Sequence, residues 1–393
     1  MNDLSKYAKY ILNGDLVAIP TETVYGLGGN ACDKSSILKI FKIKGRPRNN
    51  PLICHVHSFK FAEDNVFELS EKTRVIYKIL TDKFWPGPLT LIAKKRANIV
   101  DEVAISGKVG VRCPNNALTL ELLKLLPVPV AAPSANRSGH ISPTSPIHVS
   151  KEFDQSYMNE IGINVWILDG GECCNVGIES TVLEYNEDGN FICIFRCGGI
   201  SRKQIWKTLI DNYQNSNEWI KDIRINYFNN NKLSSSNYPP PYDSITVSPG
   251  MDIKHYSPTI STKLVAFVSD TQEYTAIKFD LRNVVLIDIG SKLSFLKCFV
   301  RYYFSLCDDY DFSLACKNLF STLHKAEDLA NSFDQPSSAC ILITGFETED
   351  NISLALWDRV YRASCGEFIY CNLNEIKIQD KYIKTFYQNN KRQ

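Results

Sequence analysis

The order of apolar and polar positions predicts short strands alternating with helices along the first half of the chain. Residues 5–13 have the spaced apolar positions of a helix that stops at Gly14, and residues 16–19 follow as an apolar strand that stops at Pro20. Helical spacing returns over residues 34–42. Later apolar runs are short and separated by turn residues: PLICHV, LTLIA, VGVR, VPVAA, VWILD, STVLEY and ICIFR. This alternation favours an α/β sheet domain.

The pattern changes between residues 212 and 258, where Asn, Ser, Tyr and Pro dominate and long apolar periodicity disappears. We therefore predict a first domain over residues 1–211, a connecting segment over 212–261 and a second domain over 262–393.

The last segment shows a second βαβ rhythm. Its strand candidates are residues 263–268, 283–289, 339–344 and 368–370, and its helix candidates are 293–306 and 312–332. Such a rhythm predicts a smaller, parallel, Rossmann-like α/β domain. The sequence has no GxGxxG string, so dinucleotide binding is not supported.

Composition and charge narrow the class of protein. The chain has 393 residues, 44% of them hydrophobic and 22% charged, with a formal net charge of +1. These values exclude a mainly disordered protein, and the balanced charge argues against one that coats nucleic acid or an anionic membrane. The 13 cysteines include no CxxC pair and are read as reduced thiols. With no apolar leader and no apolar run near the about 20 residues that span a bilayer, we expect a cytoplasmic protein without a membrane partner.

Polar residues of the first domain gather where apolar strands end, between prolines and glycines. In an α/β sheet such ends are where ligands bind. The cations among them are Lys44, Arg46, Arg48, Arg112, Arg137 and Arg196, whereas the acids are few, namely Glu22 and Glu179. Arginine forks surrounded by hydroxyls and amides suit a polyanion. No P-loop, GxSxG or HExxH string is present.

These loops, in this order, resemble the YrdC domain of the threonylcarbamoyl-adenylate synthases. The matching strings are PTETVYGLG (20–28), KGRPRNNPLICH (44–55), WPGPLTLI (85–92), VRCP (111–114), PVAAPSANRSGHISPT (129–144), ESTVLEY (179–185) and RCGGIS (196–201). Two further strings, SPGMDIKHYSP (248–258) and ALWDRVYRAS (355–364), resemble the linker and C-terminal domain of the long, two-domain form. The resemblance implies a twisted mixed sheet with helices around a concave basic cavity, linked to the second domain.

The resemblance also implies an activity. An enzyme of this family is a nucleotidyltransferase that makes threonylcarbamoyl-AMP and pyrophosphate from L-threonine, bicarbonate and ATP. A threonylcarbamoyl-transferase complex then moves the group onto tRNA as N6-threonylcarbamoyladenosine, so tRNA is an indirect partner. Mg²⁺ is expected with ATP and needs few protein ligands, because such ions often keep bound waters.

Residue by residue, the family motifs carry over as follows. The catalytic positions are Lys44, Arg46, Ser134 and Asn136. The threonine pocket maps onto Thr23, His55, Arg112 and Ser180. ATP contacts map onto Arg46, Asn50, Lys108, Ala132, Ser134, Ser142 and Arg196, with Lys108 and Ala132 contributing mainly backbone. The chain departs from the family where Ile253 replaces a linker aromatic and where residues 347–353 read ETEDNIS.

Three other interpretations remain open at this point. A double-stranded RNA-binding module would bind with a steep salt dependence and without ATP turnover. A nucleotide-sensing module is the second, and a hydrogenase-maturation carbamoyltransferase, which would need further cysteine pairs and an acylphosphatase domain, is the third. We also predict that residues 248–258 act as a lid over the cavity, the alternative being a simple tether.

Overall fold

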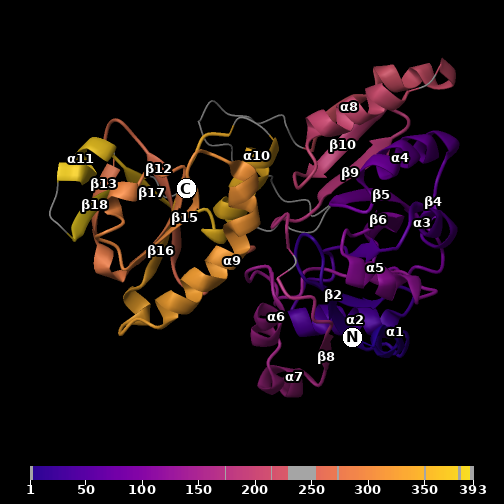
Figure 1. Ribbon diagram of the computed structural model, residues 1–393, viewed down its shortest axis with the longest axis horizontal. Helices are drawn as coiled ribbons and strands as arrows, with labels where there is room; N and C mark the ends of the chain where they lie inside the picture. Colours follow the sequence, from indigo (N-terminus) through magenta and orange to yellow (C-terminus); the bar gives the residue numbers. More distant parts are fainter. Residues whose placement is uncertain are drawn as a thin grey trace. The chain divides into compact units, whose positions relative to one another are not determined.

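The computed structural model describes residues 3–172, 174–213, 215–228, 254–271, 274–348, 351–378 and 382–389. The chain divides into two compact units. The first contains the strands β1 to β11 and the second the strands β12 to β18, as Figure 1 shows.

The first unit is built on one mixed sheet. Its strands are β1 (Leu16–Ile19), β2 (Gly26–Asn30), β3 (Ile53–His55), β4 (Phe67–Glu68), β5 (Leu89–Lys95), β6 (Lys108–Arg112), β7 (Val130–Ala131), β8 (Val165–Ile167), β9 (Thr181–Asn186), β10 (Phe191–Arg196) and β11 (Arg224–Tyr227). They lie in the order β11-β10-β9-β5-β6-β3-β7-β2-β1-β8, and β4 pairs with β5. Parallel pairs such as β3/β6 and β5/β9 alternate with antiparallel ones such as β5/β6, so the predicted mixed sheet is confirmed.

Eight helices of the first unit are described. They are α1 (Leu4–Leu12), α2 (Lys34–Lys44), α3 (Phe59–Asn65), α4 (Glu71–Phe84), α5 (Ala117–Lys124), α6 (Pro146–Glu152), α7 (Gln155–Ile161) and α8 (Arg202–Asn212). The ends of α2 matter for the site. Asp33 caps its first turn through the backbone N–H groups of Ser35 and Ser36, and Gly45 ends it with a left-handed φ of 60°.

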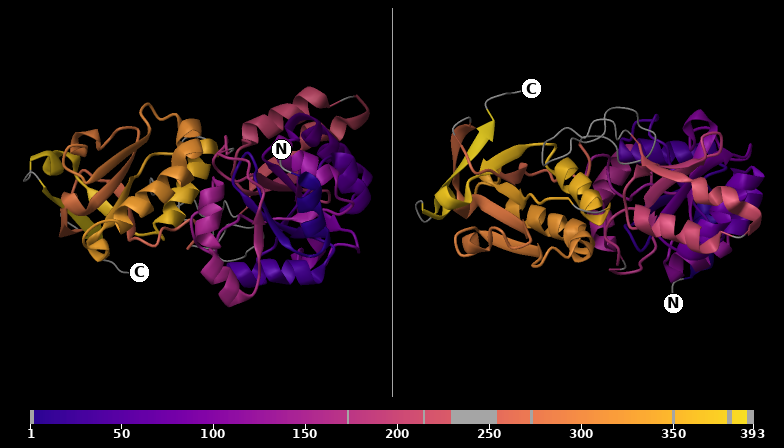
Figure 2. Two further views of the ribbon diagram at one scale, coloured as in Figure 1. Left: turned by 60° about the horizontal axis from the view of Figure 1, so that its bottom comes forward. Right: turned by 90° about the horizontal axis from the view of Figure 1, so that it is seen from above.

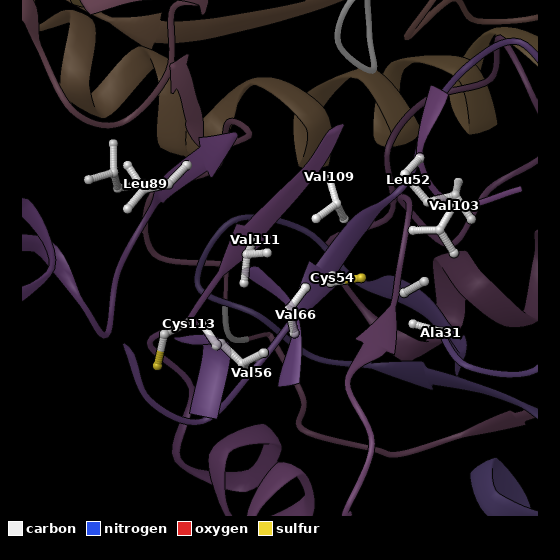
Figure 3. Close-up of a cluster of buried hydrophobic side chains, with 14 of the residues drawn as sticks. Ala31, Leu52, Cys54, Val56, Val66, Leu89, Val103, Val109, Val111 and Cys113 are labelled. Atoms are coloured by element: carbon white, nitrogen blue, oxygen red, sulfur yellow. The ribbon is translucent and has the colours of Figure 1, made fainter. Parts of the chain in front are cut away.

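One face of the central strands packs into the main core. Cys54 and Val56 of the β3 segment lie there with Val109, Val111 and Cys113 of the β6 segment, as Figure 3 shows. Successive side chains of a strand point to opposite faces. The side chains of His55 and Arg112 therefore point to the other face, away from this core.

That other face is covered unevenly. Over β1 and β7, an apolar cluster with α1 and α5 covers it, including Ile11, Val17, Leu122 and Val130. Over β5, β9 and β10 a smaller cluster includes Ile92, Val182 and Phe195. Polar groups occupy the positions between these two clusters, and they form the candidate site.

The second unit has a seven-stranded sheet. Its strands are β12 (Thr262–Phe267), β13 (Tyr274–Asp280), β14 (Val284–Ile289), β15 (Tyr302–Cys307), β16 (Cys340–Thr344), β17 (Phe368–Cys371) and β18 (Ile383–Asn389), in the order β13-β18-β17-β12-β16-β14-β15. The five strands from β17 to β15 are parallel, as predicted, whereas β13 and β18 add an antiparallel edge that the sequence did not indicate.

The helices of this unit are α9 (Phe312–Asn331), α10 (Asn351–Ala363) and α11 (Leu373–Ile378). α9 packs on β14, β15 and β16, and α10 packs beside α9, which Figure 2 shows from two sides. The helix predicted over residues 293–306 is wrong. Only Ser294–Leu296 forms one 3₁₀ turn, and Tyr302–Cys307 is strand β15, paired in parallel with β14. The aromatic side chains of β15 favour a strand, and its pairing with β14 selects that conformation over a helix.

The first sheet extends beyond residue 211, the predicted end of the first domain. A 3₁₀ segment (Asn215–Asp222) and β11 follow α8, and Ile220, Ile223 and Ile225 are buried in the core of the first unit. The predicted lid at 248–258, with Ile253, lies mostly outside the described residues. The described residues 254–258 include Tyr256, whose buried ring lies 5.2 Å from the ring of Phe320 on α9.

None of the helices in the described ranges has the length and apolarity that a membrane crossing needs.

Candidate active site

Several of the predicted site residues come from strand ends that the first sheet places next to one another. His55 ends β3 and Arg112 ends β6, and the two residues are direct register partners. Ser134 follows β7 and forms a bridge with Gly26 at the start of β2, the strand that Thr23 precedes. Segments far apart in the sequence therefore meet on the polar part of one sheet face.

Arg112 is a buried cation held by the loop before β2. Its Nη1 donates to Thr23 Oγ1 at 3.0 Å, and its Nη2 lies 2.8 Å from Oε1 of Glu22. Thr23 is oriented in turn by Thr21, whose hydroxyl lies 2.9 Å away and contacts the backbone of Val24 at 2.6 Å. The sequence singled out Glu22 as one of the few acids in these loops but gave it no role; its burial beside Arg112 is visible only in the structure.

His55 is buried beside Arg112. Burial, and then the positive charge of Arg112, lower the pKa of His55 to about 3. The imidazole is therefore neutral at pH 7 and can act as a hydrogen-bonding group rather than as a cation.

Lys44, the last residue of α2, is buried and points into the loop after β7. Its Nζ donates to the carbonyl of Ser134 at 2.6 Å and also to the carbonyl of Asn136. Burial, followed by the charge of Arg46, holds the pKa of Lys44 well below its usual range. The Lys44 side chain thus links the end of α2 to the SAN string at residues 134–136.

Arg46 is held by its own loop. Its Nη2 donates to Asn50 Oδ1 at 2.5 Å and to the carbonyl of Pro51 at 3.0 Å, and its Nε donates to the carbonyl of Asn50 at 3.2 Å. Arg48, two residues away, is exposed. One loop therefore presents a buried and a solvent-exposed arginine.

Ser180 and Arg196 meet where β9 begins and the antiparallel strand β10 ends. Arg196 donates to the carbonyl of Ser180 through Nε and to its hydroxyl through Nη2, both at 3.0 Å. The hydroxyls of Ser180 and Thr90 lie 2.7 Å apart. Close by in the sequence, Glu179 accepts a hydrogen bond from Ser142 at 3.0 Å.

Two glycines allow the backbone to approach this region closely. A Cβ atom at Gly198 would lie 2.3 Å from the carbonyl oxygen of Glu179, and one at Gly28 would lie 2.8 Å from Cγ1 of Val130. Neither position can carry a side chain without moving the segments that bear Ser180 and Ser134.

Two of the predicted contacts lie apart from these groups or act through the backbone. Lys108 starts β6, at the opposite end of the strand from Arg112, and its exposed side chain pairs with Glu184. Ala132 is buried and its N–H donates to the carbonyl of Ile53 at 2.9 Å. Both assignments to ATP remain predictions.

Within the described ranges, His, Cys, Asp and Glu side chains form no group of three or more that could hold a metal ion. The site is instead a set of buried cations and hydroxyls. Lys44, Arg46, Arg112 and Arg196 are buried, and so are the acids Glu22 and Glu179. Such an arrangement can bind and orient several anionic groups at once.

Comparison with known proteins adds relatives over both units. The family model described as "Telomere recombination" matches residues 9–198, and the model described as "Threonylcarbamoyl-AMP synthase, C-terminal domain" matches residues 200–365. Proteins named threonylcarbamoyl-AMP synthase are 38% identical in Pyrococcus abyssi and 36% in Bacillus subtilis, over 66% and 65% of this chain. These alignments cover 66% and 64% of the relatives' own length.

A longer alignment joins the two units. The protein named threonylcarbamoyl-AMP synthase in Schizosaccharomyces pombe is 30% identical over 93% of this chain and 89% of its own. The solved structure of P. abyssi Sua5 complexed with L-threonine is 32% identical, with a TM-score of 0.70, and the match covers 94% of this chain and 96% of that one.

Proposed function

Because the chain belongs to the threonylcarbamoyl-AMP synthase family, we propose that it makes threonylcarbamoyl-AMP and pyrophosphate from L-threonine, bicarbonate and ATP. The product would serve the N6-threonylcarbamoyladenosine modification of tRNA. The relatives do not favour the RNA-binding or nucleotide-sensing alternatives, because those that align with both units are named as synthases.

The observation that carries this proposal is the set of buried cations on the polar part of the first sheet. The reaction brings together a triphosphate, an amino-acid carboxylate and a carbamate, which repel one another. The buried residues Lys44, Arg46, Arg112 and Arg196 come from three segments of the first unit: the end of α2 with the loop after it, the end of β6 and the end of β10. Preorganised cations stabilise such charges without rearranging during the reaction, so the chemistry needs no protein nucleophile.

The threonine end of the site lies at Arg112. Its guanidinium is held between Thr23 and Glu22 and suits a carboxylate, because a planar fork can donate two parallel hydrogen bonds. The neutral imidazole of His55 and the hydroxyl of Ser180 supply uncharged polar groups that match the rest of an L-threonine molecule. The solved relative bound to L-threonine supports this substrate.

The nucleotide end is assigned to Lys44, Arg46 and Arg196. In this assignment Lys44 holds the SAN string and also binds the α-phosphate, the group that the carbamate attacks. Asn50, Ser142 and Asn136 complete the polar surroundings. Mg²⁺ would enter with ATP, bound chiefly by phosphate oxygens and water, as such ions often are.

The partners follow from the product. Threonylcarbamoyl-AMP is a reactive mixed anhydride, so we expect a threonylcarbamoyl-transferase complex to accept it and tRNA to be reached indirectly. A cytoplasmic location fits that role, and none of the described cysteines forms a disulfide.

The direct test measures pyrophosphate release by the full chain with all three substrates and with each left out in turn. We expect release only when ATP, L-threonine and bicarbonate are all present. Equal release without L-threonine would contradict the proposal and indicate a general nucleotidase.

A further inference from the structure

Glu22 carries a buried negative charge to which the predicted reaction gives no role. The side chains of Glu22 and Arg112 are each 6% exposed, and Oε1 of Glu22 lies 2.8 Å from Nη2 of Arg112. The contact is an ion pair without hydrogen-bond alignment. Within the described part of the chain, neither carboxylate oxygen of Glu22 has a hydrogen-bond partner, and Nε and Nη2 of Arg112 also lack one.

Such a pair is a poor way to stabilise a fold. Burying two charges costs more than their attraction returns unless further hydrogen bonds satisfy both groups. A carboxylate has about four acceptor positions, and buried ones normally use them. The unused acceptors of Glu22 therefore favour a ligand that brings its own N–H donors.

L-threonine brings such donors next to the group that Arg112 is expected to bind. Its α-carbon carries a carboxylate and an ammonium group, and Arg112 and Glu22 present the opposite charges side by side. The hydrogen bond from Arg112 to Thr23 Oγ1 at 3.0 Å fixes one side of the guanidinium. We propose that Glu22 binds the α-ammonium group of L-threonine and accepts the proton that this nitrogen must lose to become a carbamate.

The step balances without any further reactant. The amine nitrogen forms a bond to the carbon of bicarbonate, and the C–O bond to the bicarbonate hydroxyl breaks. Two protons leave the nitrogen: one converts the departing hydroxide to water, and the other goes to the Glu22 carboxylate. The products are N-carboxythreonine, water and a neutral Glu22, which returns its proton to solvent when the product leaves.

The groups around the Glu22–Arg112 pair suit this role. Arg112 supplies the neighbouring cation and Thr23 a hydroxyl. Cys113 lies close enough that the charge of Glu22, after burial, raises the pKa of its thiol, so it stays protonated. His55 is a weak proton acceptor because its pKa is lowered to about 3.

The inference rests on the proposed function, but its test does not need turnover. We would measure the dissociation constants of L-threonine and of (2S,3R)-2,3-dihydroxybutanoate, in which a hydroxyl replaces the amine, with the full-length wild type, Glu22→Gln and Glu22→Asp. Glu22→Gln should weaken L-threonine binding about 10- to 100-fold, the scale of one lost charge-assisted hydrogen bond, and the analogue less than about threefold. Glu22→Asp should restore part of the preference for the amine.

Two outcomes would overturn the inference. Equal weakening of both ligands by Glu22→Gln would make Glu22 only a positioning residue for Arg112, and unchanged L-threonine binding would leave it without a role. If Glu22→Gln fails to fold, a wild type that does not prefer L-threonine over the analogue refutes the inference by itself. A wild type that binds L-threonine with the expected preference but forms no product would refute the proposed function instead.

Discussion

Two buried acids, Asp288 of the second unit and Glu22 of the first, are bonded in contrasting ways. In the second unit, the buried carboxylate of Asp288 accepts hydrogen bonds from the backbone of Leu293, the hydroxyl of Tyr303 and the hydroxyl of Thr344, at 3.0, 2.9 and 2.8 Å. In the first unit, Glu22 and Arg112 form a buried ion pair, and both carry polar atoms that have no hydrogen-bond partner within the described residues.

The difference separates two uses of a buried charge. A fully bonded group such as Asp288 links β14, β15 and β16 and repays its own desolvation. An incompletely bonded pair costs stability, which favours a role in ligand binding over a structural one. This contrast favours ligand binding at the polar sheet face of the first unit, and a structural role for the buried acid of the second.

The largest expected effect is on catalysis. Arg46→Ala should lower pyrophosphate formation about 100- to 1,000-fold, the scale of one lost preorganised contact to developing charge. The melting temperature should change little, because the hydrogen bonds from Arg46 to Asn50 and Pro51 lie within its own loop. Arg48→Ala, which removes the exposed arginine of the same loop, is the matched control and should stay within about threefold of wild type. Equal losses in the two variants would show that general loop charge, not a placed cation, is what matters.

Asp288→Ala should have the opposite effect: a large loss of stability with little change in activity. It leaves three donors in a buried position, so the free energy of unfolding should fall by about 3 kcal/mol in denaturant titrations. Protein that remains folded should still form pyrophosphate at a rate within about twofold of wild type. Stability equal to that of wild type would remove the distinction between the two units.

The third prediction concerns pH. The pKa of His55 is about 3 in the folded chain and near its ordinary value in the unfolded one, so the unfolded state binds the extra proton as pH falls. The contribution of a neutral His55 to stability is complete above about pH 7 and is lost progressively toward pH 3. Between pH 7 and pH 5 the wild type should lose about 2 kcal/mol more than His55→Gln. Parallel stability curves for the two proteins would contradict the burial of a neutral His55.

The smallest effect separates the two ends of the site. Arg112→Lys keeps the charge but loses the planar fork, so the KM for L-threonine should rise about tenfold or more. The KM for ATP should change less than about threefold, since Arg112 is not among the groups assigned to the nucleotide. Matched increases in both constants would indicate that the two ends act as one.

Local pattern was enough to predict much of this fold. The strands 16–19, 283–289 and 339–344 and the helix 312–332 follow from apolar runs and helical spacing, and the structure has each within about two residues. The helix predicted at 293–306 failed because its apolar spacing fits either state, and only the neighbour β14 selects the strand β15. The antiparallel edge of β13 and β18 depends on a pairing between distant segments that no local pattern contains.

Prediction of the site from the sequence has the same limit, because contacts between distant segments are not visible in it. The family resemblance identified Arg112, Thr23 and Lys44, because motifs that recur in a family mark residues even when their neighbours in space are unknown. They did not show that Lys44 is tied to the carbonyls of Ser134 and Asn136, since that contact joins segments 90 residues apart. Glu22 was visible as a rare acid among loop cations, but its pairing with Arg112 follows only from the register that brings β6 beside β3 and the loop before β2 near them.

A crystal structure of the full chain with L-threonine bound would test directly whether Arg112 binds the substrate. We expect the carboxylate of the amino acid to lie within about 3.2 Å of the Arg112 guanidinium, on the polar part of the first sheet face. L-Threonine bound anywhere else, with the Glu22–Arg112 pair unchanged and unoccupied, would contradict it.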